Sequence, residues 1–372
     1  MIDDNGASAP EHSPPSSYDG VSPSDGGTAF RFTGTWTEYL PIALTNLALT
    51  IVTLGIYRFW ATARTRRYLW SRTHFADDTL EWTGTGLEMF IGFLIVMAFL
   101  IPFLLFFQFG FQALLLRGHW ALAIGGLVAF YVGLFYLIGL ATFRALRYRL
   151  SRTYWHGIRG GSDDAGWGYA ASALGKTLLS VLTLGLLVPW TMTRLWNERW
   201  SKMSFGPHPF RAAATQRGLI GRWLLLYLTP VIAIPLVAGL AFAVGPRGGM
   251  SEGGILVAFA VVLVLYLLIL LVSLAYYAKF YRRAIGATAL GPLDLAFTAR
   301  SSDWLRLIGG TIALIVLTLG IGLIFVPYRN WSFFIRHLEA TGDIDLDMLT
   351  QSTARGATDA EGLASAFDVG AI

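Results

Sequence analysis

Residues 45–73 read TNLALTIVTLGIYRFWATARTRRYLWSRT. The stretch is apolar as far as the tripeptide Thr53-Leu54-Gly55, and it then becomes rich in arginine and aromatic residues. The same tripeptide ends two later apolar runs, at residues 183–185 and 318–320. An internal repeat is sought before other patterns, because it reveals the unit from which a fold is built.

The three copies also agree at positions around the tripeptide. A polar residue stands seven places before each threonine, an aromatic residue seven places after it, and an arginine eleven places after it. In this order they are Asn46, Lys176 and Thr311, then Trp60, Trp190 and Phe325, then Arg64, Arg194 and Arg329. We predict three repeated segments, at residues 39–72, 168–200 and 304–337. A shorter echo links FTGTWTEYL (32–40) to WTGTGLEMF (82–90), and we interpret both as extended or turn elements at a membrane surface.

The composition is that of a membrane protein. Hydrophobic residues make up 55% of the 372 residues and charged residues only 14%. Soluble chains carry about 25% charged residues. The mean hydropathy is +0.56. The chain has no cysteine, which excludes disulfides, thiolate metal sites and cysteine nucleophiles.

Seven apolar stretches are each long enough to form a membrane helix of about 20 residues. They lie at about 39–58, 89–116, 120–143, 168–190, 219–245, 254–278 and 304–328. We therefore predict an all-α polytopic membrane protein, with two long helix pairs at 89–143 and 219–278 and three Thr-Leu-Gly segments. The membrane domain is expected at 29–338, between disordered tails at 1–28 and 339–372, the second of which is acidic.

Basic residues separate the connecting segments into two classes. The segments 58–88, 144–167, 191–217 and 279–303 hold nineteen cations, whereas 112–119 and 245–254 hold two. Cytoplasmic loops of membrane proteins carry the excess of Lys and Arg. All four basic segments become cytoplasmic if each Thr-Leu-Gly segment enters the membrane and returns on one side. We favour this re-entrant or interfacial topology, and the alternative, in which all seven stretches span, stays open.

The stretch 45–73 and the later LTLGLLVPWTMTRLW (182–196) resemble the YjgN family of bacterial inner-membrane proteins. The resemblance covers most of residues 29–338 and is weakest in the third copy, which has Phe325 and Pro327-Tyr328. It implies a multi-pass protein of the bacterial inner (cytoplasmic) membrane. The family has no established activity, so the resemblance implies no catalytic or cofactor-binding residue.

Asn46, Lys176 and Thr311 are candidate cavity residues, because they occupy one repeat position at equal depth in apolar segments. An ionisable residue inside a membrane segment is a functional hypothesis by default. The alternative for Lys176 is that its long side chain extends to the cytoplasmic interface.

Six further residues are candidates for binding lipid headgroups. Aromatic side chains favour the headgroup level, and arginines bind lipid phosphates. The candidates are Trp60, Arg64, Arg67, Trp190, Arg194 and Arg329. The alternative is plain interfacial anchoring. The expected partners are membrane lipids, anionic ones foremost, and not nucleic acid, because a membrane surface explains the same charge.

No nucleophile–base pair or metal-ligand spacing is legible, so we expect no catalytic residue, metal or cofactor. The leading hypothesis is transport or handling of a small solute or lipid, because broken helices and repeats are typical of transporters. The alternative is a non-transporting membrane scaffold, sensor or lipid-organising protein. The sequence leaves the substrate and a homo-oligomeric state open.

Overall fold

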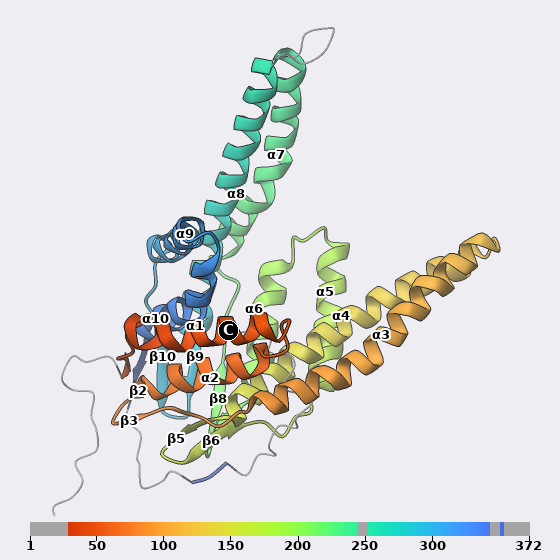
Figure 1. Ribbon diagram of the computed structural model, residues 1–372. Helices are drawn as coiled ribbons and strands as arrows, with labels where there is room; N and C mark the ends of the chain where they lie inside the picture. Colours follow the sequence, from red (N-terminus) through yellow and green to blue (C-terminus); the bar gives the residue numbers. More distant parts are fainter. Residues whose placement is uncertain (1–28, 245–251, 343–349, 353–372) are drawn as a thin grey trace, which may run out of the picture.

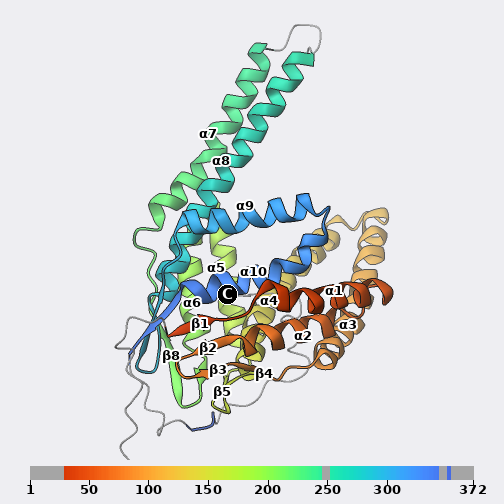
Figure 2. The same ribbon diagram turned by 60° about the vertical axis from the view of Figure 1, so that its left-hand side comes forward.

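The computed structural model describes residues 29–244, 252–342 and 350–352 (Figure 1). Within these ranges the chain forms five pairs of antiparallel helices and a set of short antiparallel strands. Figure 2 shows that the strands gather at one end of the molecule and that the helix pairs project away from them.

The helices are, in chain order, α1 (Trp36–Val52), α2 (Arg58–Ser71), α3 (Gly86–Leu116), α4 (Trp120–Ser151), α5 (Trp167–Leu182), α6 (Val188–Trp200), α7 (Ile220–Val244), α8 (Glu252–Ile285), α9 (Ser301–Leu317), the 3-10 helix η1 (Ile321–Phe325) and α10 (Val326–His337). The strands are β1 (Phe30–Phe32), β2 (Thr73–Phe75), β3 (Asp78–Thr79), β4 (Glu81–Trp82), β5 (Thr153–Trp155), β6 (Ile158–Gly161), β7 (Ser204–Phe205), β8 (His208–Ala212), β9 (Thr288–Leu290), β10 (Leu293–Phe297) and β11 (Leu338–Thr341).

Each helix pair is inserted between two strands that pair with each other. β1 precedes α1 and pairs antiparallel with β2, which follows α2. The same relation joins β4 to β5, β6 to β7, β8 to β9 and β10 to β11. We number the resulting β-α-α-β units 1 to 5 along the chain. Because these two strands pair, the first helix of each unit begins at the sheet and the second helix ends at the sheet beside it.

Tight β-hairpins connect successive units. β2 pairs with β3, β5 with β6, β7 with β8 and β9 with β10. Each hairpin turns at a residue with positive φ, namely Ala76, His156, Gly206 or Gly291. The result is an eight-stranded sheet in the order β11-β10-β9-β8-β7-β6-β5-β4 and a three-stranded sheet in the order β1-β2-β3.

The prediction of an all-α protein is therefore wrong. Its strands hold only two to five residues, too few for the alternation of apolar and polar residues to stand out in a sequence. The echo between 32–40 and 82–90 has a structural cause. Thr35 and Thr85 cap the following helices, and their hydroxyls accept hydrogen bonds from the amides of Glu38 and Glu88.

Units 2 and 4 contain the membrane-spanning candidates. Among the described residues, four helices are long and apolar enough to cross a membrane: α3, α4, α7 over Ile220–Gly239 and α8 over Phe259–Ile285. The first helices of units 1, 3 and 5 hold only 16 or 17 residues, and each turns at its Thr-Leu-Gly tripeptide into a second helix. Seven spans in alternating directions are incompatible with this return, because each unit begins and ends at the sheet.

The Thr-Leu-Gly tripeptide makes the same turn in all three short units. Its leucine has a φ of 51° in each copy, and its glycine has φ values of 92°, 87° and 95°. The threonine hydroxyl donates to the carbonyl four residues earlier, at 2.7, 2.9 and 2.6 Å. The glycine amide donates to the carbonyl five residues earlier, at 2.7 to 2.8 Å. These bonds satisfy carbonyls that the end of a helix would leave without a partner inside the helix.

The five units follow one another around a ring that closes where unit 5 meets unit 1. Trp331 of α10 stacks on Trp70 of α2 with ring centroids 3.9 Å apart. The Tyr328 hydroxyl donates to the carbonyl of Gly34 over 3.0 Å. Segments nearly 300 residues apart in sequence are thereby held together.

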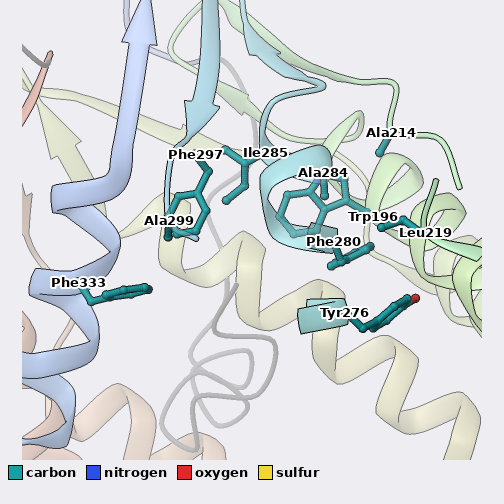
Figure 3. Close-up of a cluster of buried hydrophobic side chains, with 10 residues drawn as sticks. All are labelled: Trp196, Ala214, Leu219, Tyr276, Phe280, Ala284, Ile285, Phe297, Ala299 and Phe333. Atoms are coloured by element: carbon teal, nitrogen blue, oxygen red, sulfur yellow. The ribbon is translucent and has the colours of Figure 1, made fainter. Parts of the chain in front are cut away.

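The largest buried cluster lies where α6, α8 and α10 meet the sheet. Figure 3 shows Trp196 of α6 beside Phe280 of α8, with ring centroids 6.0 Å apart, and Phe297 of β10 on the other side of Ile285. Fully burying one such aromatic side chain contributes about 1.5–3 kcal/mol. This cluster fixes the helix pairs of units 3, 4 and 5 to a common base.

The predicted tails are described only in part. The N-terminal tail, 1–28, lies outside the described residues. Residues 339–341 of the second tail belong to β11 (Leu338–Thr341), which pairs with β10. Gln351 donates to the carbonyl of Gly157 and accepts from the amide of Arg159, so this point of the chain lies against the β5–β6 hairpin. The rest of the predicted acidic tail lies outside the described residues.

The first prediction concerns sidedness. The nineteen cations of the basic segments belong to the sheet end and the helices next to it, whereas His119 lies at the far turn between α3 and α4. We expect cysteines introduced at Ala76 and Ser201 to react with an impermeant thiol reagent only from the cytoplasmic side, and one at His119 only from the external side. Labelling of Ser201→Cys from outside would contradict the arrangement.

The second prediction concerns the turn. A Cβ added at Gly320 meets nothing within 4 Å, yet its φ of 95° is strained for other residues. We expect Gly320→Ala to lower the free energy of unfolding in detergent by about 1 kcal/mol. The control is Gly309→Ala in α9, which also meets nothing within 4 Å and should be neutral or stabilising because alanine favours helix. Equal effects of the two variants would refute the role of the turn.

Candidate lipid-facing site

The tips of units 1, 3 and 5 present apolar side chains with few neighbours. Leu54, Leu184 and Leu319 are 94%, 76% and 94% exposed, although a leucine with positive φ is strained. The flanking Val52, Leu182 and Leu317 are also exposed. Such a concentration of exposed apolar surface on helix pairs marks a surface that meets lipid or another apolar partner.

The three predicted cavity residues lie in three separate units, and each contacts the second helix of its own unit. The Asn46 amide donates to the carbonyl of Ala61 and to Thr65, both at 3.3 Å. The Thr311 hydroxyl accepts from Nε of Arg329 at 3.0 Å. The structure thus brings each residue to its own partner and does not bring the three together.

Lys176 is held by an ion pair inside unit 3. Its Nζ lies 2.7 Å from Oε1 of Glu198 on α6, and it also contacts the hydroxyl of Ser172. Burial acts to raise the pKa of the Glu198 carboxyl, but the hydrogen bonds from Lys176 and Ser172 outweigh it and hold the pKa below its ordinary value. Lys176 therefore joins the two helices of its unit, a role that neither alternative from the sequence had assigned to it.

The predicted headgroup residues fall into two groups. Arg64, Arg67 and Arg194 are exposed on the second helices of units 1 and 3. Trp60 and Trp190 are half-buried, and the ring of Trp60 packs on Phe90 with centroids 5.4 Å apart. Arg329 is also half-buried, and its guanidinium turns inward to Thr311 and the carbonyl of Leu307. The structure also forms two arginine–aromatic contacts that the sequence spacing did not reveal, Arg66 on Trp82 at 5.0 Å and Arg144 on Trp167 at 4.8 Å.

Sequence reasoning also missed the ion pairs at the base of units 1, 2 and 3. In each unit an acid near the start of the first helix meets a cation at the end of the second. The pairs are Glu38–Arg72 at 3.2 Å, Glu88–Arg152 at 3.1 Å and Asp164–Lys202 at 2.6 Å. The repeated T-x-x-E of the echo carries the first two acids, but their basic partners follow 34 and 64 residues later, too far apart to be matched from spacing.

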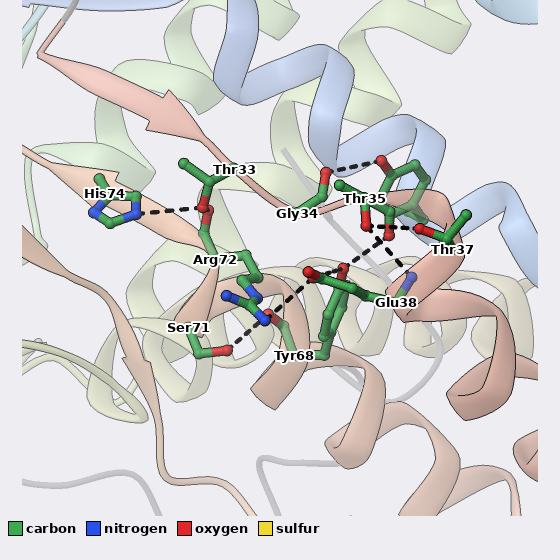
Figure 4. A network of polar contacts seen from close by, with 10 residues as sticks. Thr33, Gly34, Thr35, Thr37, Glu38, Tyr68, Ser71, Arg72 and His74 are labelled. Carbon is green, nitrogen blue, oxygen red and sulfur yellow. Dashed lines mark hydrogen bonds and ion pairs between the residues drawn. The ribbon is translucent and has the colours of Figure 1, made fainter.

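Figure 4 shows the base of unit 1. The Tyr68 hydroxyl donates to the carbonyl of Thr35 and to the Glu38 carboxylate, which also contacts Arg72. Tyr148 of unit 2 donates to Glu88 in the same way, at 2.9 Å. An acid within the first turn of a helix is also favoured by the helix dipole. These contacts fix the two helices of a unit where they leave the sheet.

Chemically, the described surface combines apolar tips with basic and aromatic side chains nearer the sheet. Among the described residues, no group of three or more His, Asp or Glu side chains is placed to hold a metal ion. The arrangement is suited to contact with a lipid leaflet, whose hydrocarbon would meet the tips and whose phosphates would meet the arginines.

The third prediction tests the Lys176–Glu198 pair. Lys176→Met leaves the Glu198 carboxylate half-buried without its cation, so we expect a loss of about 1 kcal/mol, discounted for partial exposure. Adding Glu198→Gln should recover most of that loss. Because pairing lowers the Glu198 pKa, the stabilisation is present above the ordinary carboxyl pKa of about 4.3 and disappears as the pH falls below it. Thermal unfolding in detergent at several pH values measures both effects, and purely additive single and double variants would disprove the coupling.

Comparison with known proteins agrees with the membrane architecture. The chain is 23% identical over 376 aligned residues to "Inner membrane protein YjgN" of Salmonella typhimurium, an alignment that covers 86% of this chain and 90% of the relative. It is 30% identical over 131 residues to the protein of the same name from Escherichia coli K12, covering 35% of this chain and 30% of the relative. No solved structure matches the chain.

A family model described as "Bacterial protein of unknown function (DUF898)" matches residues 27–366. The match covers all of the helix pairs and strands described above. With the four helices that are apolar enough to span, it agrees with the inner-membrane location in the names of the relatives. The chain therefore belongs to the DUF898 family and is a multi-pass protein of the bacterial inner membrane.

Proposed function

We propose that the protein is a non-transporting, lipid-organising protein of the inner membrane, which inserts its three short units into the cytoplasmic leaflet. The observation that carries the proposal is the identical Thr-Leu-Gly turn of units 1, 3 and 5, each with an exposed leucine at its tip. Each tip leucine that enters hydrocarbon contributes about 2 kcal/mol.

The length of the short units supports insertion into one leaflet. Residues 40–52 of α1 form an apolar segment of about 18 Å at 1.5 Å per residue. The hydrocarbon core of a bilayer is about 30 Å thick, so such a segment reaches about its middle. Three insertions on one side, against none from the opposite side in the described part of the chain, would add area to one leaflet and favour curvature.

Transport has less support than this proposal. It depended on a cavity shared by the polar residues at equivalent depth, and the contacts of Asn46, Lys176 and Thr311 are instead made within their own units. The exposed Arg64, Arg67 and Arg194, beside Trp60 and Trp190, suit contact with anionic lipids at the surface of the same leaflet.

The fourth prediction tests leaflet insertion. We expect the reconstituted protein to lower the diameter of vesicles of phosphatidylethanolamine and phosphatidylglycerol as its density rises, measured by cryo-electron microscopy. The triple variant Leu54→Ser, Leu184→Ser and Leu319→Ser should lose this effect, because polar tips insert less deeply.

The matched control is Leu104→Ser, Leu122→Ser and Leu225→Ser, which changes exposed leucines on the spanning helices. It should keep the effect of the parent on vesicle diameter. A tip variant that is folded and reconstituted, yet still lowers the diameter as the parent does, would show that the tips do not act on the leaflet.

A further inference from the structure

Unit 5 contains a basic cleft. The cleft has a volume of about 420 Å³ and lies between α9 and α10. Its charged lining is formed by Asp303, Arg306, Arg329, Arg336 and His337. We propose that this cleft binds a phosphate group, with the phosphate monoester headgroup of an acidic lipid as its ligand. The lipid source rests on the proposed contact of unit 5 with the leaflet, whereas phosphate binding does not.

The charge of the cleft favours a dianion. Three guanidinium groups and one carboxylate give a formal charge of +2, before any charge on His337. The Asp303 carboxylate is engaged locally: it accepts from the Arg300 amide at 2.8 Å and lies 3.3 Å from Arg306. A phosphate monoester carries about −1.5 to −2 charges near neutral pH, and guanidinium groups bind phosphate oxygens bidentately.

Arg329 forms the inner wall of the cleft. Its Nε donates to the Thr311 hydroxyl and its Nη2 lies 3.5 Å from the carbonyl of Leu307, which fixes the plane of the guanidinium. A Cβ added at Gly310 would come within 2.7 Å of Nη2, so this glycine makes the space in which the guanidinium sits. A guanidinium offers five N–H donors, so these contacts leave donors for a ligand.

His337 supplies a further polar group. Its Nδ1 lies 2.8 Å from the carbonyl of Phe333. A carbonyl only accepts hydrogen bonds, so Nδ1 carries the proton and the tautomer is fixed. Nε2 of the neutral ring is then a hydrogen-bond acceptor at the cleft, which can receive the proton of a singly protonated phosphate oxygen.

Comparison of the three short units shows that two arginines of the cleft occur in unit 5 and not at the equivalent positions of units 1 and 3. Arg306 and Arg336 correspond to Pro41 and Ser71 in unit 1, and to Ala171 and Ser201 in unit 3, counted from the tripeptide. Asp303 and His337 correspond to Glu38 and Arg72, which close the base of unit 1 with an ion pair. In unit 5 the acid instead pairs with Arg306 on its own helix. The same backbone thus carries a closed base in unit 1 and a basic cleft in unit 5.

The depth of the cleft agrees with a headgroup ligand. Eleven residues separate Arg306 from Leu317 at the end of α9, a distance of about 16 Å along the helix. Half of the hydrocarbon core is about 15 Å thick. A unit 5 whose tip reaches the middle of the bilayer therefore holds Arg306 at the level of the lipid phosphates.

The test uses the full-length protein in neutral dodecylmaltoside, where no charged membrane surface contributes. The probes are inorganic phosphate, dioctanoyl phosphatidic acid and dioctanoyl phosphatidylglycerol, and the readouts are thermal stabilisation and native mass spectra. We expect phosphatidic acid to bind at least tenfold more tightly than phosphatidylglycerol. Tighter binding of phosphatidic acid than of inorganic phosphate assigns the site to a lipid, and equal binding assigns it to a soluble phosphate and overturns the lipid source.

Two variants separate charge from position. Arg306→Gln with Arg336→Gln should weaken phosphatidic acid binding about 25-fold, from about fivefold for each cation. The control Arg211→Gln with Arg217→Gln removes the same charge from two exposed arginines that do not line the cleft, and should change binding less than threefold. Gly310→Ala changes no charge but displaces Arg329, and should weaken binding by about tenfold, whereas the neighbouring Gly309→Ala should not.

The proposal is wrong if none of the probes stabilises the parent, or if Gly310→Ala and the double arginine variant bind like the parent. Because these measurements involve no vesicle, their failure is distinct from a failure of the tip variants to change vesicle diameter. The same unfolding assay, run without ligand, reports whether each cleft variant is folded. The control variants are measured in the same detergent for comparison.

Discussion

The pairing of the strand before each helix pair with the strand after it is the interaction on which the rest of the structure depends. β1 with β2, β4 with β5 and their three counterparts hold the ends of each unit a few ångströms apart. A helix pair tied in this way crosses the membrane twice or not at all. Most cations of the basic segments stand toward the sheet end of the units, whereas Arg58 directly follows the turn of unit 1, so a cytoplasmic sheet end is the expected arrangement.

Under the proposed insertion into one leaflet, a short unit would end its helices inside lipid, where bare carbonyls are costly. In the Thr-Leu-Gly turn, side-chain and backbone donors of three consecutive residues form hydrogen bonds to these carbonyls. The threonine hydroxyl and the glycine amide satisfy carbonyls of the first helix, and the glycine accepts the positive φ. The leucine between them also has a positive φ, at a cost of about 1 kcal/mol or more, and it exposes its side chain at the tip.

Much of this organisation is legible in the sequence, because it depends on local patterns. The tripeptide, the residues at fixed offsets from it and the two long apolar pairs each lie within one short window. The strands do not, because β3 and β4 hold only two residues each, and β5, the partner of β4, lies beyond a helix pair. Three of the hairpin turns left a usable signal, because Gly157, Gly206-Pro207 and Gly291-Pro292 mark turns shortly after basic helices, whereas the turn at Ala76 carries no such mark.

The candidate site was harder to predict for a related reason. Residues at the same repeat position occupy the same place within their own units. Because the units follow one another around a ring, these residues do not face a common centre. Asn46, Lys176 and Thr311 each meet the second helix of their unit, with a different chemistry in each case. The three units therefore share their backbone and the contact between their two helices. The side chains where the helices meet the sheet differ from unit to unit. Glu38–Arg72 closes unit 1, whereas the guanidinium groups of Arg306 and Arg336 line the cleft of unit 5. Differences between copies, more than their shared residues, are the place to look for specific binding in such a chain.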